Sequence, residues 1–238
     1  SPEAASSWHT DDCNTVNDEW LVHSSSPELD KNAPFAYRIP LMVSQIKTLF
    51  GNIPENIDDF SLSSQISQGE AYKYFIERFR LKKNSHGGII WWNLIDCWPQ
   101  ISDAVVDYYG TKKLAYEYIK NVQKPVVLLF DEPDNNGIIK IVADNESPDE
   151  VTISYTISDL STGCRILSDT VTVPAHSAVP AGNISGREKS FLLAEWKYGS
   201  ERNILHGKNH FISDARGSDL KQFKKILERA GIIPINKA

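Results

Sequence analysis

The sequence predicts an α+β multidomain chain: a partial (β/α)8 barrel end (helices plus a last strand), then an immunoglobulin-like antiparallel β-sandwich and a C-terminal helix. Up to residue 124 the pattern is long helix, loop, short apolar run, loop and helix, the order of elements in an α/β barrel. After Pro125 it changes to about seven short runs separated by Pro and Gly turns, as in a sandwich. We therefore expect the C-terminal portion of a barrel domain at 1–124, a β-sandwich domain at 125–214, and a helix at 215–238 that packs back on the chain.

Composition and charge narrow the class of partner. The 238 residues carry a net charge of −6 and a pI of about 5.5, so nucleic acid is not expected as a partner. No apolar run approaches the roughly 18 residues that a membrane span needs, so no membrane partner is expected either. No signal peptide is visible, and the chain starts at Ser1 without an initiator Met, which we interpret as a processed or truncated product. Localisation stays open between bacterial periplasmic or secreted and cytoplasmic.

The cysteines and histidines predict neither a disulfide framework nor a metal site. Cys13, Cys97 and Cys164 are far apart and odd in number, so buried or free thiols are expected. His9 and His23 stand near acidic residues, but their spacing matches no common ligand pattern. We expect no cofactor and no metal.

The chain before the apolar run is expected to hold a loop-rich segment and two helices. Clustered Ser, Asp, Asn and Pro predict loops over 1–34, with Trp8 and Trp20 as anchors. Helical spacing predicts one helix over 33–50 and a long one over 56–83. The long helix carries Glu70 and Glu77, which could be proposed as catalytic carboxylates. The favoured interpretation is an ion pair with a neighbouring Lys73 or Arg80 on a solvated face.

The central stretch of the sequence runs from Gly87 to Pro99. Its apolar part, Ile89 to Trp92, has the length and β-branched content of a fully buried strand, and a closing helix follows from about Thr111 to Gln123. Aromatic faces stack on pyranose rings, and Asn or Asp can bind sugar hydroxyls. The predicted substrate-binding residues are therefore Trp91, Trp92, Asn93, Asp96 and Trp98.

Two alternatives remain open within this stretch. The tryptophans could be packing in a core strand. If they bind sugar, alternation sends Trp91 and Trp92 to opposite sides of the strand, and Trp92 is favoured because it is nearer the strand end. Asp96 could equally be structural, bonding backbone amides in the loop.

The second part of the chain shows the alternation of strands. The apolar runs are 126–130, 137–143, 151–158, 164–167, 169–173, 190–196 and 203–212. Tyr155, Trp196 and Tyr198 could bind sugar, but Trp196, at the end of an apolar run, is better explained as core. His206 and His210 have no Cys or carboxylate at ligand spacing, so zinc is not expected. Near the end, Ser218 caps a helix that Gly231 stops.

The run Gly-Gly-Ile-Ile-Trp-Trp-Asn-Leu-Ile-Asp-Cys-Trp-Pro, followed by Asp107-Tyr108-Tyr109-Gly110 and Lys113-Leu114-Ala115-Tyr116, resembles the end of the catalytic barrel in glycoside hydrolase family 2. The similarity is to its β-mannosidase-like and exo-β-glucosaminidase-like branches. Ile95 departs from the pattern, because Asn is common there. Asn209-His210-Phe211 resembles the Asn-His-Tyr that recurs near the end of the family's sandwich domain.

The resemblance implies a retaining exo-β-glycosidase that hydrolyses O-glycosidic bonds in carbohydrate, so the expected partners are a β-glycoside substrate and the upstream part of the same polypeptide. Both catalytic Glu of the family stand at the ends of barrel strands four and seven, which we expect upstream of this chain. No catalytic residue is therefore expected here, the fragment alone should be inactive, and its contribution would be the eighth-strand wall of the sugar site. The alternative is a non-catalytic carbohydrate-binding or interaction β-sandwich module.

Overall fold

The computed structural model describes residue 23 and residues 38–83, 85, 87–186 and 189–234. The chain divides into two compact units. The first unit holds the described residues up to Tyr72, Ile90–Glu117 and Arg216–Leu220. The second holds Lys73–Ile89, Tyr118–Ala215 and the residues from Lys221 on. The expected anchors Trp8 and Trp20, as well as His9 and Cys13, lie outside the described residues.

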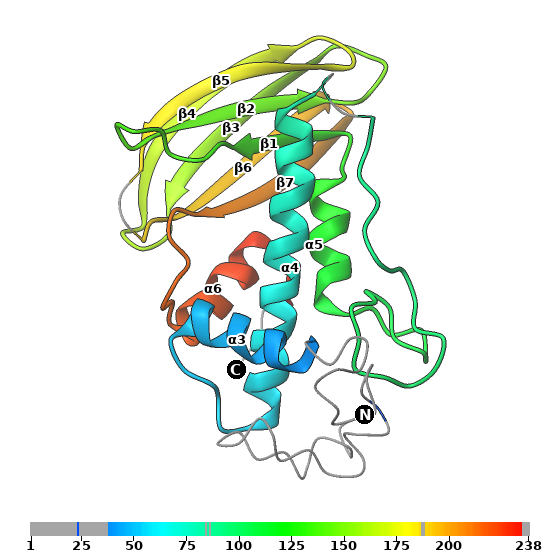
Figure 1. The fold of residues 1–238 in the computed structure, drawn as a ribbon. Helices are drawn as coiled ribbons and strands as arrows, with labels where there is room; N and C mark the ends of the chain where they lie inside the picture. The colour runs from blue at the N-terminus through cyan, green and yellow to red at the C-terminus, as the bar shows by residue number, and fades with distance from the viewer. Residues whose placement is uncertain (1–22, 24–37, 84, 86, 187–188, 235–238) are drawn as a thin grey trace. The chain divides into compact units, whose positions relative to one another are not determined.

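The second unit is built on two antiparallel sheets, which confirms the predicted sandwich. The first sheet has the order β1-β2-β5 and the second the order β4-β3-β6-β7, as Figure 1 shows. The strands are β1 (Val126–Phe130), β2 (Ile138–Asn145), β3 (Val151–Asp159), β4 (Cys164–Val173), β5 (Ser177–Ser185), β6 (Phe191–Ser200) and β7 (Asn203–Ile212). The predicted runs 164–167 and 169–173 are thus one strand.

The core of the sandwich follows from alternation along the strands. On β3, Ile153, Tyr155 and Ile157 are buried and the hydroxyl residues between them are partly or fully exposed. They pack with the wholly buried β1 and with Trp196 of β6. Tyr155 and Trp196 are therefore core residues, and the interpretation of Trp196 as core is confirmed.

One strand, β5, was not predicted, because Pro180 and Gly182 stand inside it. Proline cannot donate to a ladder and is tolerated on edge strands. β5 is such an edge, pairing only with β2, and its register shifts so that Val142 pairs with Pro180 and Ile141 with Gly182. A Cβ on Gly182 would lie 2.9 Å from the Leu167 side chain, so this glycine fits a close approach.

The predicted buried strand at Ile89–Trp92 is wrong. No strand is assigned there, and the side chains of Ile90 and Trp92 are 99% and 72% exposed. A strand is stable only where neighbouring strands satisfy its backbone groups. In the described part of the chain no strand pairs with this run, so an apolar, β-branched composition alone does not make it a strand.

The helices largely agree with the predictions. They are α3 (Arg38–Phe50), α4 (Ile57–Leu81), α5 (Leu114–Val122) and α6 (Leu220–Ala230). Asn56 caps α4: its Oδ1 accepts a hydrogen bond of 2.9 Å from the Asp59 amide. α6 buries Phe223, Ile226, Leu227 and Ala230. Phe223 meets Phe191 of β6 edge-to-face, with 6.3 Å between ring centroids.

Glu77 is buried, so its expected place on a solvated face is wrong, although its pairing with Lys73 is confirmed. The Lys73 Nζ donates to Glu77 Oε2 at 2.7 Å. Asn209 of β7 donates to Glu77 Oε1 at 2.6 Å and to the Leu128 carbonyl of β1 at 2.8 Å. Buried charges need such partners, and here they join the end of α4 to one strand of each sheet.

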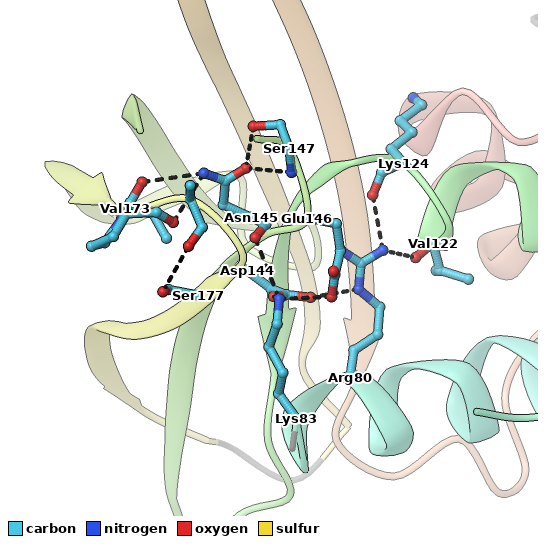
Figure 2. A network of polar contacts seen from close by, with 12 residues as sticks. Arg80, Lys83, Val122, Lys124, Asp144, Asn145, Glu146, Ser147, Val173 and Ser177 are labelled. Atoms are coloured by element: carbon cyan, nitrogen blue, oxygen red, sulfur yellow. Dashed lines mark hydrogen bonds and ion pairs between the residues drawn. The ribbon is translucent and has the colours of Figure 1, made fainter. Parts of the chain in front are cut away.

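A second polar network joins the end of α4 to β2 (Figure 2). Asp144 is fully buried, and its two carboxylate oxygens accept from Arg80 Nε at 2.6 Å and Lys83 Nζ at 2.7 Å. Arg80 Nη1 also donates to the carbonyls of Val122 and Lys124, at 2.8 Å each. One guanidinium therefore holds β2 and the connection between α5 and β1.

Candidate functional site

The candidate site lies in the first unit, where two stretches of chain run side by side. The Val105 and Val106 amides donate to the carbonyls of Asn93 and Leu94 at 3.2 and 2.9 Å. The Asp96 amide donates to the Val106 carbonyl at 3.1 Å. We call this arrangement the 93–106 ladder. It fixes the backbone immediately after Trp92, because the Asn93 carbonyl is one of its acceptors.

The two adjacent tryptophans have different surroundings. Trp91 is half-buried and meets Tyr72 of α4 edge-to-face, with ring centroids 5.8 Å apart. Trp92 is exposed, and its carbonyl accepts a hydrogen bond of 2.5 Å from the Tyr72 hydroxyl. The peptide bond between Trp92 and Asn93 is cis. Because Trp92 is exposed and Trp91 meets Tyr72, the indole of Trp92 is the open aromatic face, while Trp91 packs on the helix.

The Tyr72 hydroxyl fixes the backbone of this segment by hydrogen bonds to the carbonyls of Trp92 and Asp103. Burial raises the pKa of its phenol, the charge of Asp103 raises it further, and a hydrogen bond with Gln68 opposes the shift. The hydroxyl therefore stays protonated and donates to the carbonyls of Trp92 and Asp103, the latter at 3.2 Å.

Asp96 is turned inward. The whole residue is 4% exposed, whereas the neighbouring Trp92 and Trp98 are 72% and 39% exposed. Oδ1 accepts from the Ser102 hydroxyl and from Gln100 Nε2 at 3.1 Å, and Oδ2 accepts from Lys113 Nζ at 3.0 Å. These contacts favour the structural alternative for Asp96, although the partners are side chains and not the backbone amides that were expected. Asn93 is half-buried, and its side-chain amide makes only a long contact, 3.5 Å, with the Ile95 carbonyl.

Trp98 is partly exposed and stacks on His23, with ring centroids 6.3 Å apart at an interplanar angle of 21°. His23 Nδ1 lies 2.9 Å from the Pro99 carbonyl, and the Ile101 amide donates to the His23 carbonyl at 2.6 Å. His23 therefore supports this ring. No motif in the sequence pairs residues 75 positions apart, so this contact could not be predicted.

Sequence reasoning also gave no role to Tyr72, Lys113 or the exposed pair Tyr108 and Tyr109. The two tyrosine rings meet edge-to-face at 5.3 Å in a loop that Asp107 fixes, because its Oδ1 accepts from the amides of Tyr109 and Thr111. Lys113 and the tyrosines belong to the motifs that carry the resemblance, which was the available signal. For Tyr72 there was none.

Clusters of metal-ligating side chains and membrane-spanning helices can be sought only among the residues that the structure describes. Among those residues, no group of three or more His, Cys, Asp and Glu is placed to hold a metal ion. None of the described helices has both the length and the apolar character to cross a bilayer.

Comparison with curated proteins shows which class of sequence the chain is similar to. Beta-mannosidase B of Thermothelomyces thermophilus is 36% identical over 78 residues, 31% of this chain and 9% of that protein. Beta-mannosidase B of Aspergillus niger is 32% identical over 76 residues, again 31% and 9%. The chain thus spans only about a tenth of the length of these relatives. Its relatives are glycosidases.

Solved structures give the fold. The β-D-mannosidase of Dictyoglomus thermophilum matches 84% of this chain and 25% of its own with a TM-score of 0.65 at 23% identity. An exo-chitosanase of Amycolatopsis orientalis matches 79% and 25% with a TM-score of 0.57 at 19% identity. No protein-family model matches the chain. The curated beta-mannosidases confirm the resemblance to glycoside hydrolase family 2, and the solved structures share the fold.

Proposed function

We propose that this chain is the carboxyl-terminal part of a retaining exo-β-glycosidase and forms one wall of its sugar site. In this proposal residues 1–124 complete the catalytic barrel, residues 125–214 are the sandwich domain that follows, and the helix of residues 215–238 packs back on the chain. The substrate is a β-glycoside, and the upstream part of the same polypeptide is the partner.

The observation that carries the proposal is the open indole of Trp92 next to Asn93. An exposed tryptophan whose backbone accepts a hydrogen bond from a half-buried phenol is suited to stack on the apolar face of a pyranose ring. The Asn93 side chain can both donate and accept, as sugar hydroxyls require. Trp98, supported by His23, is a second candidate platform.

The chemistry itself would come from upstream. A retaining glycosidase uses two carboxylates about 5 Å apart, one as nucleophile and one as acid/base. The resemblance assigns both to Glu residues before this chain. The exposed Ile90, Leu94 and Ile95 support that arrangement, because apolar side chains in one short stretch are typical of a surface that another part of a protein covers.

The test is hydrolysis of aryl β-glycosides (mannoside, glucoside, galactoside, glucuronide and glucosaminide) by this chain and by the longest natural polypeptide that contains it. We expect no turnover by the chain and release from one substrate by the longer protein. In the longer protein, Trp92→Ala should raise KM about tenfold or more, a loss of about 1.4 kcal/mol, and Trp92→Phe should retain most of the binding. Turnover by the chain alone would show that the carboxylates have been misplaced.

One observation favours the alternative, a carbohydrate-binding sandwich. A shallow hollow on the outer face of β3, β4, β6 and β7 is lined by Ser154, Thr156, Ser168, Thr170, Glu195, Lys197 and His206. Thr156→Val and Trp92→Ala distinguish the two, because only the former touches this face. Retarded migration of the chain in gels containing soluble mannan or chitosan, lost with Thr156→Val alone, would support the alternative.

A further inference from the structure

We infer that Asp96 and Lys113 are positioning residues: with Ser102 they form a clamp that sets the place of Trp92 and Asn93, and they do not themselves bind sugar. This inference rests on the proposed function, because it assigns a role within that sugar site. We call the three residues the Asp96 clamp.

The first argument is that the Asp96 carboxylate is buried and already accepts hydrogen bonds from three side chains. Oδ1 accepts from two side chains, those of Ser102 and Gln100, and Oδ2 accepts from the Lys113 ammonium at 3.0 Å. The Asp96 side chain is almost completely buried, at 1% exposure, and that of Lys113 is mostly buried. A sugar hydroxyl could reach this carboxylate only if the side chains that cover it moved aside.

The second argument is where the clamp lies. Asp96, Ser102 and Lys113 come from three successive pieces of chain, and the backbone joins the same three pieces. The Asp96 amide donates to the Val106 carbonyl, and the Lys113 amide donates to the Val105 carbonyl at 2.8 Å. Lys113 Nζ also lies 3.4 Å from Ser102 Oγ, which in turn accepts from the Ala104 amide at 3.1 Å. The clamp therefore closes across the 93–106 ladder.

The third argument is the consequence of opening the clamp. Removing one partner of a buried ion pair leaves the other charge without compensation, which costs far more than the pair itself contributes. The unpaired group then draws in water, and the ladder whose first acceptor is the Asn93 carbonyl loosens. A displacement of about 1 Å in a substrate-positioning group can reduce catalysis by about a hundredfold.

The experiment uses the longest natural polypeptide that contains the chain and compares Asp96→Asn, Lys113→Met and Lys113→Arg. The matched control is Asp144→Asn, which removes a buried, doubly paired carboxylate from the sandwich, far along the sequence from the ladder. Two quantities are measured for each variant: hydrogen exchange of the amides at residues 93–106, and kcat and KM on the aryl glycoside that the wild type cleaves.

Asp96→Asn and Lys113→Met should each speed hydrogen exchange in the ladder and raise KM about tenfold or more. Lys113→Arg should keep both the exchange rate and KM close to the wild-type values, because it keeps the charge. Asp144→Asn should lower the melting temperature and leave KM unchanged. Faster exchange with an unchanged KM would overturn the positioning role, as would unchanged exchange. An inactive wild type would refute the proposed function and, with it, the role in sugar positioning, while the exchange data would still decide whether the clamp orders the ladder.

Discussion

Trp196 depends on a single glycine across the β6–β7 ladder. A Cβ built on Gly207 would lie 2.2 Å from two atoms of the Trp196 ring, which is far inside van der Waals contact. The ring is buried in the sandwich core and cannot move aside without disturbing its neighbours. Any side chain larger than that of glycine at position 207 should therefore destabilise the sandwich.

We expect Gly207→Ala to lower the free energy of unfolding by about 1–3 kcal/mol, the usual cost of overpacking a core. Urea denaturation followed by circular dichroism measures this. Gly87→Ala is the control, because an added Cβ there meets nothing within 4 Å. Equal stability of the two variants would contradict the close approach.

At the residue scale, the sequence pointed to a candidate segment but not to the surroundings of each of its side chains. The spacing of aromatic and polar residues from Trp91 to Trp98 identified the segment, because such a combination is uncommon in a core strand. Which ring is open depends on Tyr72 of α4, and the partners of Asp96 lie 4 to 17 positions away without a recurring interval. Long-range contacts of this kind carry no local signal.

At the scale of elements, the end of α4 is fastened to β2 by charge. Lys83 donates to Asp144 and also pairs with Glu146 at 2.6 Å (Figure 2). The hydrogen bond from Lys83 lowers the pKa of Glu146 below its ordinary value of 4.5, with smaller contributions from the charges of Lys83, Arg80 and His176, against burial. A carboxyl whose folded pKa is lowered stabilises the fold above its ordinary pKa, and that stabilisation is lost as the pH falls through the folded value.

Glu146→Gln should therefore lower stability at neutral pH and flatten the loss of stability below about pH 4.5. Melting temperatures measured from pH 3 to pH 7 would show the wild-type and variant curves converging at the acidic end. Glu201→Gln, in an exposed turn, serves as the control. Parallel curves for wild type and Glu146→Gln would show that this ion pair does not contribute.

Elements were predictable where the periodic pattern and the local caps agreed. The alternation on β3 and the Asn56 cap of α4 are cases in which neighbouring residues decide the structure. The pattern failed at β5, where an edge position tolerates Pro180, and at Ile89–Trp92, where no strand in the described residues offers a partner. Both errors depend on which strands pair with a segment, and the sequence of that segment does not contain this information.

For the whole molecule, the exposed apolar stretch around Trp92 should determine how readily the chain self-associates and binds apolar dyes. Ile90 is almost fully exposed and has Trp92, Leu94 and Ile95 close by in sequence, all exposed. Contiguous exposed apolar side chains favour association and the binding of apolar dyes. The chain by itself should therefore bind the dye 8-anilinonaphthalene-1-sulfonate.

We expect Ile90→Ser to lower the fluorescence of this dye clearly, and Ile166→Ser to lower it little, because Ile166 is the one large apolar side chain that is exposed on β4. Titration of the dye at fixed protein concentration makes the comparison, with circular dichroism as the check of folding. The same loss with both variants would show that the stretch from Ile90 to Ile95 is no special surface.

The contrast between two tryptophans offers a direct view of both units by nuclear magnetic resonance. Within the described residues, the Trp196 indole N–H is buried and has no hydrogen-bond acceptor, whereas the Trp92 ring faces solvent. A soluble paramagnetic agent should therefore broaden the indole signal of Trp92 and spare that of Trp196. The Trp92 signal then reports whether that ring is covered, by sugar or by protein. The Trp196 signal reports whether the sandwich core around Gly207 is still packed.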